Sequence, residues 1–97
     1  MTIQKTILEN ETVLALSGLL DSGTAKQLQD AVDTLEAGTP ALVLDMSELE
    51  YISSAGVRVL VAAHKKMNGK ISLRHVRQEV QSILHLVGVD KRIHIEP

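Results

Sequence analysis

The sequence feature that most constrains the fold is a short apolar run, Leu42-Val43-Leu44, placed between two segments with helical periodicity. Three consecutive aliphatic residues are typical of a strand that is buried on both faces, and such strands occur in parallel sheets covered by helices. A parallel neighbour needs a crossover connection, which a helix usually supplies. The run therefore predicts an α/β domain with a buried central strand.

The segments on both sides of this run predict the order β-β-α-β-α-β-α-β. Apolar alternation predicts further strands at residues 3–8, 13–16 and 70–74, and a short last edge strand around Ile93 and Ile95. Apolar residues at helical spacing predict helices from Thr24 towards Gly38, over 54–67 and over 76–87, the last ending at Gly88. This order favours a mixed sheet of four to five strands with helices packed on it.

Two local patterns predict how the segments are joined. Thr24-x-x-Gln27 fits a capping box, in which each side chain accepts a hydrogen bond from an unpaired backbone amide at the helix start. Residues 18–23 and the polar stretch 45–48 are predicted to be loops. In sheets of this kind, partners tend to engage the edge at which the parallel strands lead into helices.

Composition excludes several classes of function. The chain has no Phe, no Trp and one Tyr, so modules that stack nucleic-acid bases on aromatic platforms are excluded. Without Cys there is no disulfide framework, zinc–thiolate site or thiol nucleophile, and a core that needs no disulfides suits the cytoplasm. No apolar run approaches the roughly 18–20 residues that span a membrane, so we expect no membrane insertion. Residues 1–97 are expected to form a single domain.

Motifs for catalysis, cofactors and metals are missing. The four histidines lie about ten residues apart on different predicted elements, without the spacing of a metal site. There is no nucleophile elbow, phosphate-binding glycine loop or dinucleotide-binding fingerprint. The sequence therefore predicts a protein that is not an enzyme and uses no cofactor. The basic cluster at Lys65, Lys66, Lys70, Arg74 and Arg77 is interpreted as a solvated face rather than a nucleic-acid site.

The net charge of −2 is divided unevenly along the chain. Residues 1–50 carry nine acids and two bases, a net charge of −7, whereas residues 51–97 carry three acids and eight bases, a net charge of +5. One interpretation is two solvated faces of opposite sign. The other is a docking surface with a charge that complements a partner protein.

The segment Ser53-Ser54-Ala55-Gly56 is where a functional site is expected. On one interpretation Ser53 or Ser54 is only the N-cap of the following helix. On the other, the small residues leave an open helix start, whose free N–H groups and partial positive charge favour a phosphate, while Gly56 lets another surface approach. A phosphoserine here would leave the fold intact and would confront a docked partner with a new dianion beside the acids Asp21, Asp45, Glu48 and Glu50.

The chain resembles the STAS domain, the sulfate-transporter and anti-sigma-factor-antagonist family. The resemblance lies in the element order, in Leu44-Asp45-Met46-Ser47-x-Leu49, in Tyr51 to Leu60, in Gly18-Leu19-Leu20-Asp21 and in Leu84-x-x-x-Gly88-Val89. It implies the STAS fold and an acceptor for phosphate at Ser54, with Ser53 as the alternative. Three positions depart from the family pattern: Ser53 stands where Asp is frequent, Ala55 where Ser is frequent, and Leu19 where an acidic residue is common.

The resemblance also implies a function and partners. The unphosphorylated domain would bind an anti-sigma factor that is also a serine kinase, and so free the sigma factor. That kinase would phosphorylate the domain, and a PP2C-type phosphatase would restore it; the free domain is expected to be a monomer. The alternative is a constitutive interaction subunit, for example of a phospholipid-transport ATPase complex. The residues predicted to contact the partner are Asp21, Ser22, Asp45, Ser47, Glu48, Ser53, Ala55, Gly56 and Arg58.

Overall fold

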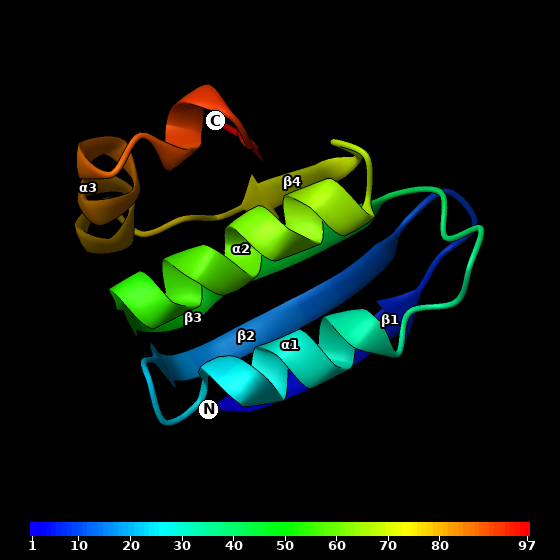
Figure 1. The fold of residues 1–97 in the computed structure, drawn as a ribbon, viewed down its shortest axis with the longest axis horizontal. Helices are drawn as coiled ribbons and strands as arrows, with labels where there is room; N and C mark the ends of the chain where they lie inside the picture. Colours follow the sequence, from blue (N-terminus) through cyan, green and yellow to red (C-terminus); the bar gives the residue numbers. More distant parts are fainter.

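In a computed structural model that describes all 97 residues, a five-stranded sheet has the order β1-β2-β3-β4-β5 (Figure 1). The β1 strand is antiparallel to β2, and every other neighbouring pair is parallel. The elements are β1 (Thr2–Ile7), β2 (Thr12–Leu20), α1 (Ala25–Asp33), β3 (Leu42–Ile52), α2 (Ser54–Lys66), β4 (Ile71–Arg74), α3 (Gln78–Leu86), the 3₁₀ turn η1 (Val89–Lys91) and β5 (His94–Ile95). The predicted α/β class, mixed sheet and element order are confirmed.

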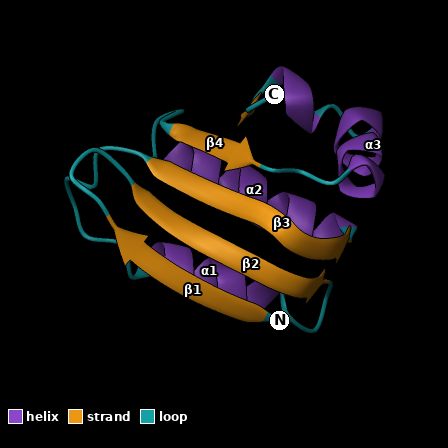
Figure 2. Ribbon diagram, turned by 180° about the vertical axis from the view of Figure 1, so that it is seen from behind, coloured by secondary structure: helices purple, strands orange, loops and turns teal.

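The sheet has one covered face and one open face. Helices α1 and α2 lie across one face, and the view from behind shows the opposite face without a helix (Figure 2). Side chains alternate across the sheet, so Leu42 and Leu44 point to the helices while Val43 points to the open face, yet all three are buried. The prediction of a central strand buried on both sides is therefore confirmed. The core is built from Leu, Val, Ile, Met and Ala alone.

The predicted loop at residues 45–48 is wrong, because β3 continues without a break to Ile52. Two irregularities in its pairing with β2 explain the error. Ala15 and Ser17 pair with Asp45 and Glu48, so β3 gains one residue there, and it gains a second between Leu49 and Tyr51. Each bulge interrupts the alternation of buried and exposed residues that identifies a strand. The polar stretch therefore resembles a loop in sequence although it is a strand in space.

Other element boundaries also differ from the predictions. The β2 strand runs through to Leu20, so the predicted loop 18–23 is shorter. Helix α1 ends at Asp33 rather than near Gly38, and Leu35 is buried beyond the helix. Helix α3 begins only at Gln78, but Gly88 follows it in the left-handed conformation, with φ of 79°, as predicted.

The capping box predicted at the start of α1 is absent. Thr24 is the N-cap residue, but its side chain makes no capping bond. Its hydroxyl instead donates to the carbonyl oxygen of Leu19 at 2.8 Å and accepts from the amide of Asp21 at 2.9 Å. The Gln27 side chain donates to the Met1 carbonyl oxygen at 2.9 Å. Both side chains therefore bond to neighbouring segments of the chain and do not cap the start of the helix.

Candidate functional site at the start of helix α2

The two adjacent serines have different roles at the start of α2. Ser53 is the N-cap, and its Oγ accepts a 3.4 Å hydrogen bond from the Gly56 amide. Its own amide donates to the Leu20 carbonyl oxygen at 2.9 Å, which ties the start of α2 to the end of β2. Ser54 is the first helical residue; it is exposed, and its Oγ makes no hydrogen bond. One serine hydroxyl is therefore used by the fold and the other is free.

Gly56 is buried beneath this helix start. A Cβ atom added to it would lie 2.6 Å from Leu20 Cγ and 2.9 Å from Ile52 Cγ1. These distances are shorter than a carbon–carbon contact allows, so only Gly lets α2 sit this close to the ends of β2 and β3. The expectation that Gly56 exposes backbone to another molecule is corrected, because the surface that approaches it is the core of the protein itself.

The loop before α1 lies at the same edge of the sheet, but its polar groups are occupied. The Asp21 carboxylate accepts from the amides of Gly23 at 2.9 Å and Thr24 at 3.1 Å. The Asp21 carbonyl oxygen accepts from the amides of Thr24 and Ala25. Ser22, in the same loop, is exposed. Asp21 thus closes the loop, and Ser22 is its freely accessible hydroxyl.

Asp45 is far from the two serines, contrary to the expectation that it stands beside them. It pairs with Ala15, five residues before the end of β2 at Leu20, which at about 3.3 Å per residue is roughly 17 Å along the sheet. Partial burial alone would raise the pKa of its carboxyl. The hydrogen bond from the Ser47 amide at 3.0 Å and the contact with His75 at 3.3 Å outweigh that effect and hold the pKa below its usual value.

Glu48 and Ser47 are engaged by the segment that follows β4. Arg77 Nε donates to the Ser47 carbonyl oxygen at 2.9 Å, and Arg77 lies 3.5 Å from the Glu48 carboxylate. Together with His75–Asp45 and Arg74–Glu11, this contact pairs bases from the second half of the chain with acids from the first half. Part of the charge asymmetry along the sequence is therefore neutralised within the molecule. Neither of the two interpretations given above included such internal ion pairs.

The open face of the sheet carries a second polar network at the C-terminal end. Arg74 Nε donates to Glu96 Oε1 at 3.0 Å, and Ser72 Oγ donates to Glu96 Oε2 at 3.2 Å. The hydrogen bonds from Arg74 hold the pKa of Glu96 below its usual value and raise that of Arg74. This network fastens the end of the chain to β4.

The charged groups on α2 itself are basic. The helix carries Arg58, His64, Lys65 and Lys66 and no acid. Arg58 is exposed, takes part in no ion pair and stands four residues after Ser54, so the two share one face of the helix. The serine start is consequently bordered along α2 by positive charge, where the sequence led us to expect acids.

Sequence reasoning did not single out two exposed apolar residues at the end of α3. Leu86 is 84% exposed and Val87 is 55% exposed. The apolar spacing assigned Val87 to the buried side of the third helix, and this assignment is wrong, because the helix ends at Leu86 and Val87 turns outward as its C-cap. The available signal was Leu86 itself, an apolar residue outside the predicted buried stripe.

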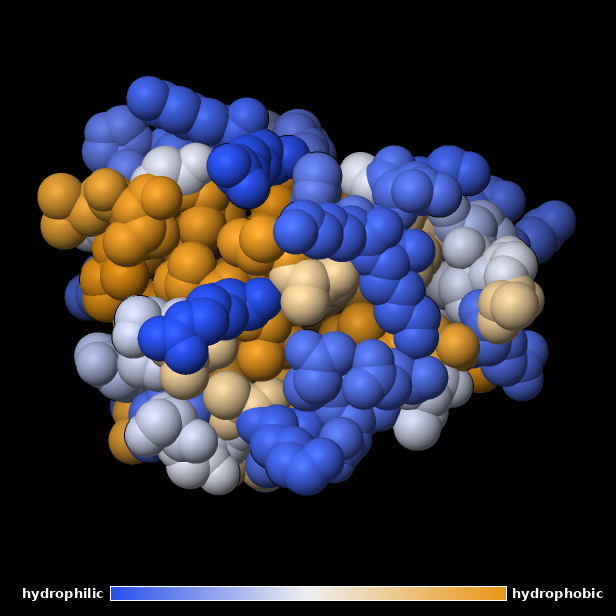
Figure 3. Space-filling model, viewed as in Figure 1, coloured by the Kyte–Doolittle hydropathy of each residue, from blue (hydrophilic) through white to orange (hydrophobic).

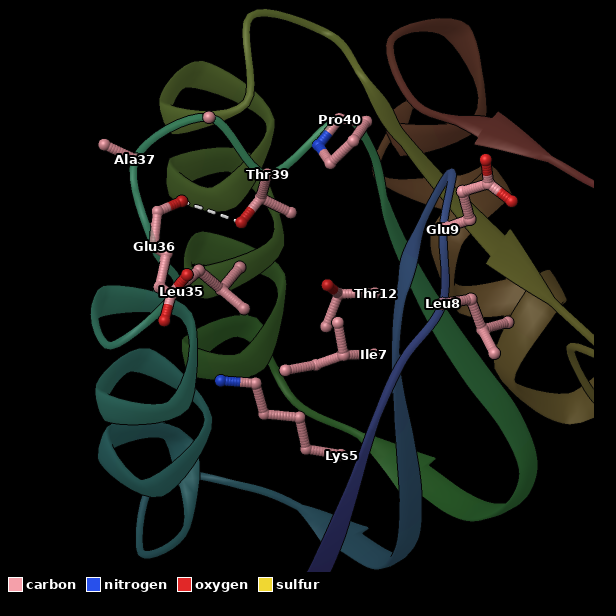
Figure 4. A pocket seen from close by; sticks show the side chains of 11 residues that line it. Lys5, Ile7, Leu8, Glu9, Thr12, Leu35, Glu36, Ala37, Thr39 and Pro40 are labelled. Carbon is pink, nitrogen blue, oxygen red and sulfur yellow. Dashed lines mark hydrogen bonds between the residues drawn. The ribbon is translucent and has the colours of Figure 1, made fainter.

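The hollow drawn in Figure 4 lies at the opposite end of the sheet, between the β1–β2 turn and the loop before β3. It has a volume of about 250 Å³, and inside it Thr39 Oγ1 donates to the Glu36 carbonyl oxygen at 2.7 Å. Its charged side chains are Lys5, Glu9 and Glu36, of which Lys5 and Glu9 point in different directions. No group of three His, Asp or Glu side chains is placed to hold a metal ion. No helix combines the length and apolarity needed to cross a membrane.

Comparison with known proteins identifies the family to which this fold corresponds. It also covers the edge of the sheet at which α1 and α2 start and which carries Ser22, Ser53 and Ser54; we call it the serine edge. The family model described as Mlab, STAS domain, matches residues 3–96. RsfB, an anti-sigma-F factor antagonist of Mycobacterium tuberculosis, is 31% identical over 86 residues, which cover 86% of this chain and 70% of RsfB.

Solved structures of other proteins have the same fold. The crystal structure of an anti-sigma factor antagonist from Mycobacterium paratuberculosis superposes with a TM-score of 0.89 at 29% identity, covering 99% of this chain and 85% of that one. The Bacillus cell fate determinant SpoIIAA in its phosphorylated form superposes with a TM-score of 0.73 at 16% identity, covering 99% and 92% of the two chains. At that identity the likeness concerns the fold alone.

Proposed function

Because this chain belongs to the STAS domain family, we propose that it is an anti-sigma-factor antagonist switched by phosphorylation of Ser54. The unphosphorylated protein binds an anti-sigma factor that is also a serine kinase, and the sigma factor is freed. The kinase then transfers the γ-phosphoryl group of ATP to Ser54 Oγ, whose proton is lost, and the modified protein no longer binds. A PP2C-type phosphatase hydrolyses the phosphate ester and restores the first state.

The free hydroxyl of Ser54 is the observation that carries this proposal. Ser54 is exposed and unbonded, whereas the Ser53 hydroxyl is half-buried and caps the helix. A phosphate at the first helical position would meet free backbone amides and the positive end of the helix dipole. The modification therefore leaves the fold standing and changes only the surface that a partner meets. The match to RsfB supports the family role.

The partner surface proposed for this function is the serine edge. Of the residues predicted to contact a partner, Ser22 and Arg58 are exposed at the same edge as Ser54, and Ala55 is partly exposed. Asp45 and Ser47 lie earlier in β3, away from this edge. We therefore propose that they do not contact the part of the partner that recognises Ser54.

A second candidate function is a constitutive interaction subunit, for example of a phospholipid-transport ATPase complex. One observation favours it: the family model that matches residues 3–96 is the Mlab STAS domain. In that function Ser54 would never carry a phosphate, and an ATPase rather than a serine kinase would co-purify with the protein.

The experiment that tests the proposal is phosphopeptide mapping of the protein from its native cells, followed by titration against the kinase that co-purifies. We expect one phosphate on Ser54, lost in Ser54→Ala and retained in Ser53→Ala. Ser54→Asp should keep the fold and weaken binding by at least about tenfold, roughly 1.4 kcal/mol.

Ser53→Asp is the matched control, because it places the same charge one residue earlier, where Asp is a good N-cap. It should bind nearly as well as the wild type. A phosphate on Ser53, or equal loss of binding in both Asp variants, contradicts the assignment of Ser54. Absence of phosphate under all growth conditions, together with an ATPase partner, supports the second candidate.

A further inference from the structure

An apolar surface extends from α2 to α3 on the helical side of the molecule. Figure 3 shows a broad hydrophobic area there, over the part of the view in which Figure 1 places α3 and the first turns of α2. On α2 and at the end of α3, the large apolar side chains with exposed surface are Leu86 and Val87, 84% and 55% exposed, and the half-buried Val57, Val61 and Ile83. We call these five residues the α2–α3 patch.

The patch is larger than the fold requires. A single exposed apolar residue is ordinary, but a contiguous area rimmed by polar groups marks an interaction site. Leu86 and Val87 are neighbours at the end of α3, and Ile83 stands one turn before them. On α2, Val57 and Val61 are likewise one turn apart. Leu86 and Val87 are left largely exposed, whereas Val57 and Ile83 pack against the core and are only partly exposed.

The patch is continuous with Ser54. Along α2, Ser54, Arg58, Val61 and Lys65 follow one another at intervals of four, three and four residues, so they form one stripe of the helix surface. Val57 lies one turn after Ser54 on the flank of this stripe. A molecule that sits on the patch therefore lies against the proposed phosphorylation site.

The charge beside the patch indicates what kind of molecule fits it. Arg58 and Lys65 are exposed and unpaired, and α2 has no acid. Asp90, after α3, is held by His85 at 2.6 Å, and Glu79 stands at the opposite end of α3 from Leu86. A second copy of this chain would bring like charges together across the interface, whereas an acidic surface would be attracted.

We propose that the α2–α3 patch docks an apolar ridge flanked by Asp or Glu on the same partner that reads Ser54. This inference rests on the proposed function and specifies the chemistry of its partner. Phosphorylation of Ser54 would then place about two negative charges at the end of a basic stripe that the acidic partner needs. The modification reverses an attraction, which explains how a small group releases a large interface.

Photo-crosslinking in the native cells tests the proposal, with p-benzoylphenylalanine placed singly at Ala55, Leu86 and Thr6. Ala55 reports the serine edge, Leu86 the far end of the patch, and Thr6 the open face of the sheet. We expect one serine kinase to crosslink from Ala55 and Leu86 and not from Thr6, with both crosslinks lost in Ser54→Asp.

The other outcomes separate the two proposals. A kinase captured from Ala55 alone overturns the docking patch and leaves the proposed function intact. A second copy of this chain captured from Leu86 replaces the acidic partner with self-association. No kinase at either position removes the proposed function and this inference with it.

Binding of the captured kinase to purified variants measures the effect. Leu86→Ser/Val87→Ser should weaken binding by at least about tenfold, since these are the two most exposed apolar side chains of the patch and would bury the most surface against the partner. The matched control is Ile7→Ser/Leu8→Ser, another adjacent pair of exposed apolar residues, 69% and 50% exposed at the far end of the sheet, which should change affinity by less than about twofold.

The acidic character of the partner has its own test. Affinity should fall as salt rises from about 0.05 M to about 0.5 M, and Arg58→Glu should weaken binding more than Arg58→Gln. Equal losses of affinity in Leu86→Ser/Val87→Ser and in Ile7→Ser/Leu8→Ser, or an affinity independent of salt, would overturn the inference.

Discussion

Helices α1 and α2 start side by side at one edge of the sheet, each after a parallel strand, and they use their polar residues differently. Before α1, Asp21 and Thr24 bond to neighbouring backbone groups, so their oxygen atoms are occupied. At α2, Ser53 performs the capping and Ser54 is left free. The difference shows that the polar group to suspect of function is the one the fold does not use.

The largest expected effect concerns the close packing of Gly56 against Leu20, which is found at the start of α2 and not at the start of α1. Leu20→Ala should lower the free energy of unfolding by about 3 kcal/mol, because Leu20 is fully buried. Gly56→Ala should cost about 1–2 kcal/mol through the clash with Leu20, less the gain in helix propensity. In the Leu20→Ala background the same Gly56→Ala change should cost less, because only the 2.9 Å contact with Ile52 Cγ1 remains. Urea unfolding of the four proteins measures this coupling, and simple additivity would show that the two residues do not compete for space.

The next effect tests whether the start of α1 is closed by its side chains. Asp21→Ala removes the acceptor of two amide hydrogen bonds and should cost about 1–2 kcal/mol. Ser22→Ala, one residue away and exposed, is the control and should fall within about 0.5 kcal/mol of the wild type. Equal stabilities of the two variants in thermal unfolding would remove this half of the comparison.

A smaller effect separates the two serines of α2. Ser53→Ala should cost about 0.5–1 kcal/mol, at the lower end for an N-cap because its hydrogen bond is long at 3.4 Å. Ser54→Ala should leave stability within about 0.5 kcal/mol of the wild type. If Ser54→Ala proves the more destabilising in urea titration, Ser54 is structural and the contrast between the helix starts disappears.

The smallest effect lies away from both helix starts and is a control on pH. The pKa of Glu96 is lowered in the folded state, so its contribution is present above the unfolded pKa of about 4.3 and is lost as the pH falls through the lower folded value. Glu96→Gln should therefore lose less stability than the wild type between about pH 5 and pH 3. Thermal unfolding across that range measures it, and an unchanged acid slope would mean that the Arg74–Glu96 contact contributes nothing.

Much of the fold is predictable from the sequence, because apolar periodicity and glycines mark most elements. Leu42-Val43-Leu44 and Gly88 are examples in which one local rule suffices. The continuation of β3 through residues 45–52 is not predictable in this way, since bulges arise from pairing with β2 and cancel the alternation. The capping box fails because Thr24 bonds to the preceding turn, at Leu19 and Asp21, and because Gln27 bonds to Met1, which only the fold brings near.

The candidate site is predictable in place and less so in its surroundings. Ser53, Ser54 and Gly56 carry local signals of a helix start. Which serine is free, and what lies beneath Gly56, depend on Leu20 and Ile52, which only the folded chain brings there. The same holds for Asp45 and Glu48, whose closeness to the serines in sequence does not survive in an extended strand.

The two extra residues in β3 have a consequence for how this segment can vary. They let the eleven residues of β3 pair with the nine residues of β2, and they bring Met46, Leu49 and Ile52 to the buried face at intervals of three residues. Deleting one residue between Asp45 and Tyr51 would remove a bulge and restore the regular two-residue alternation there, but the strand would lose the local bend and added twist that the bulge gives it before the serines. The number of residues in this stretch, and not only their identity, therefore decides the direction in which β3 leads into Ser53 and Ser54.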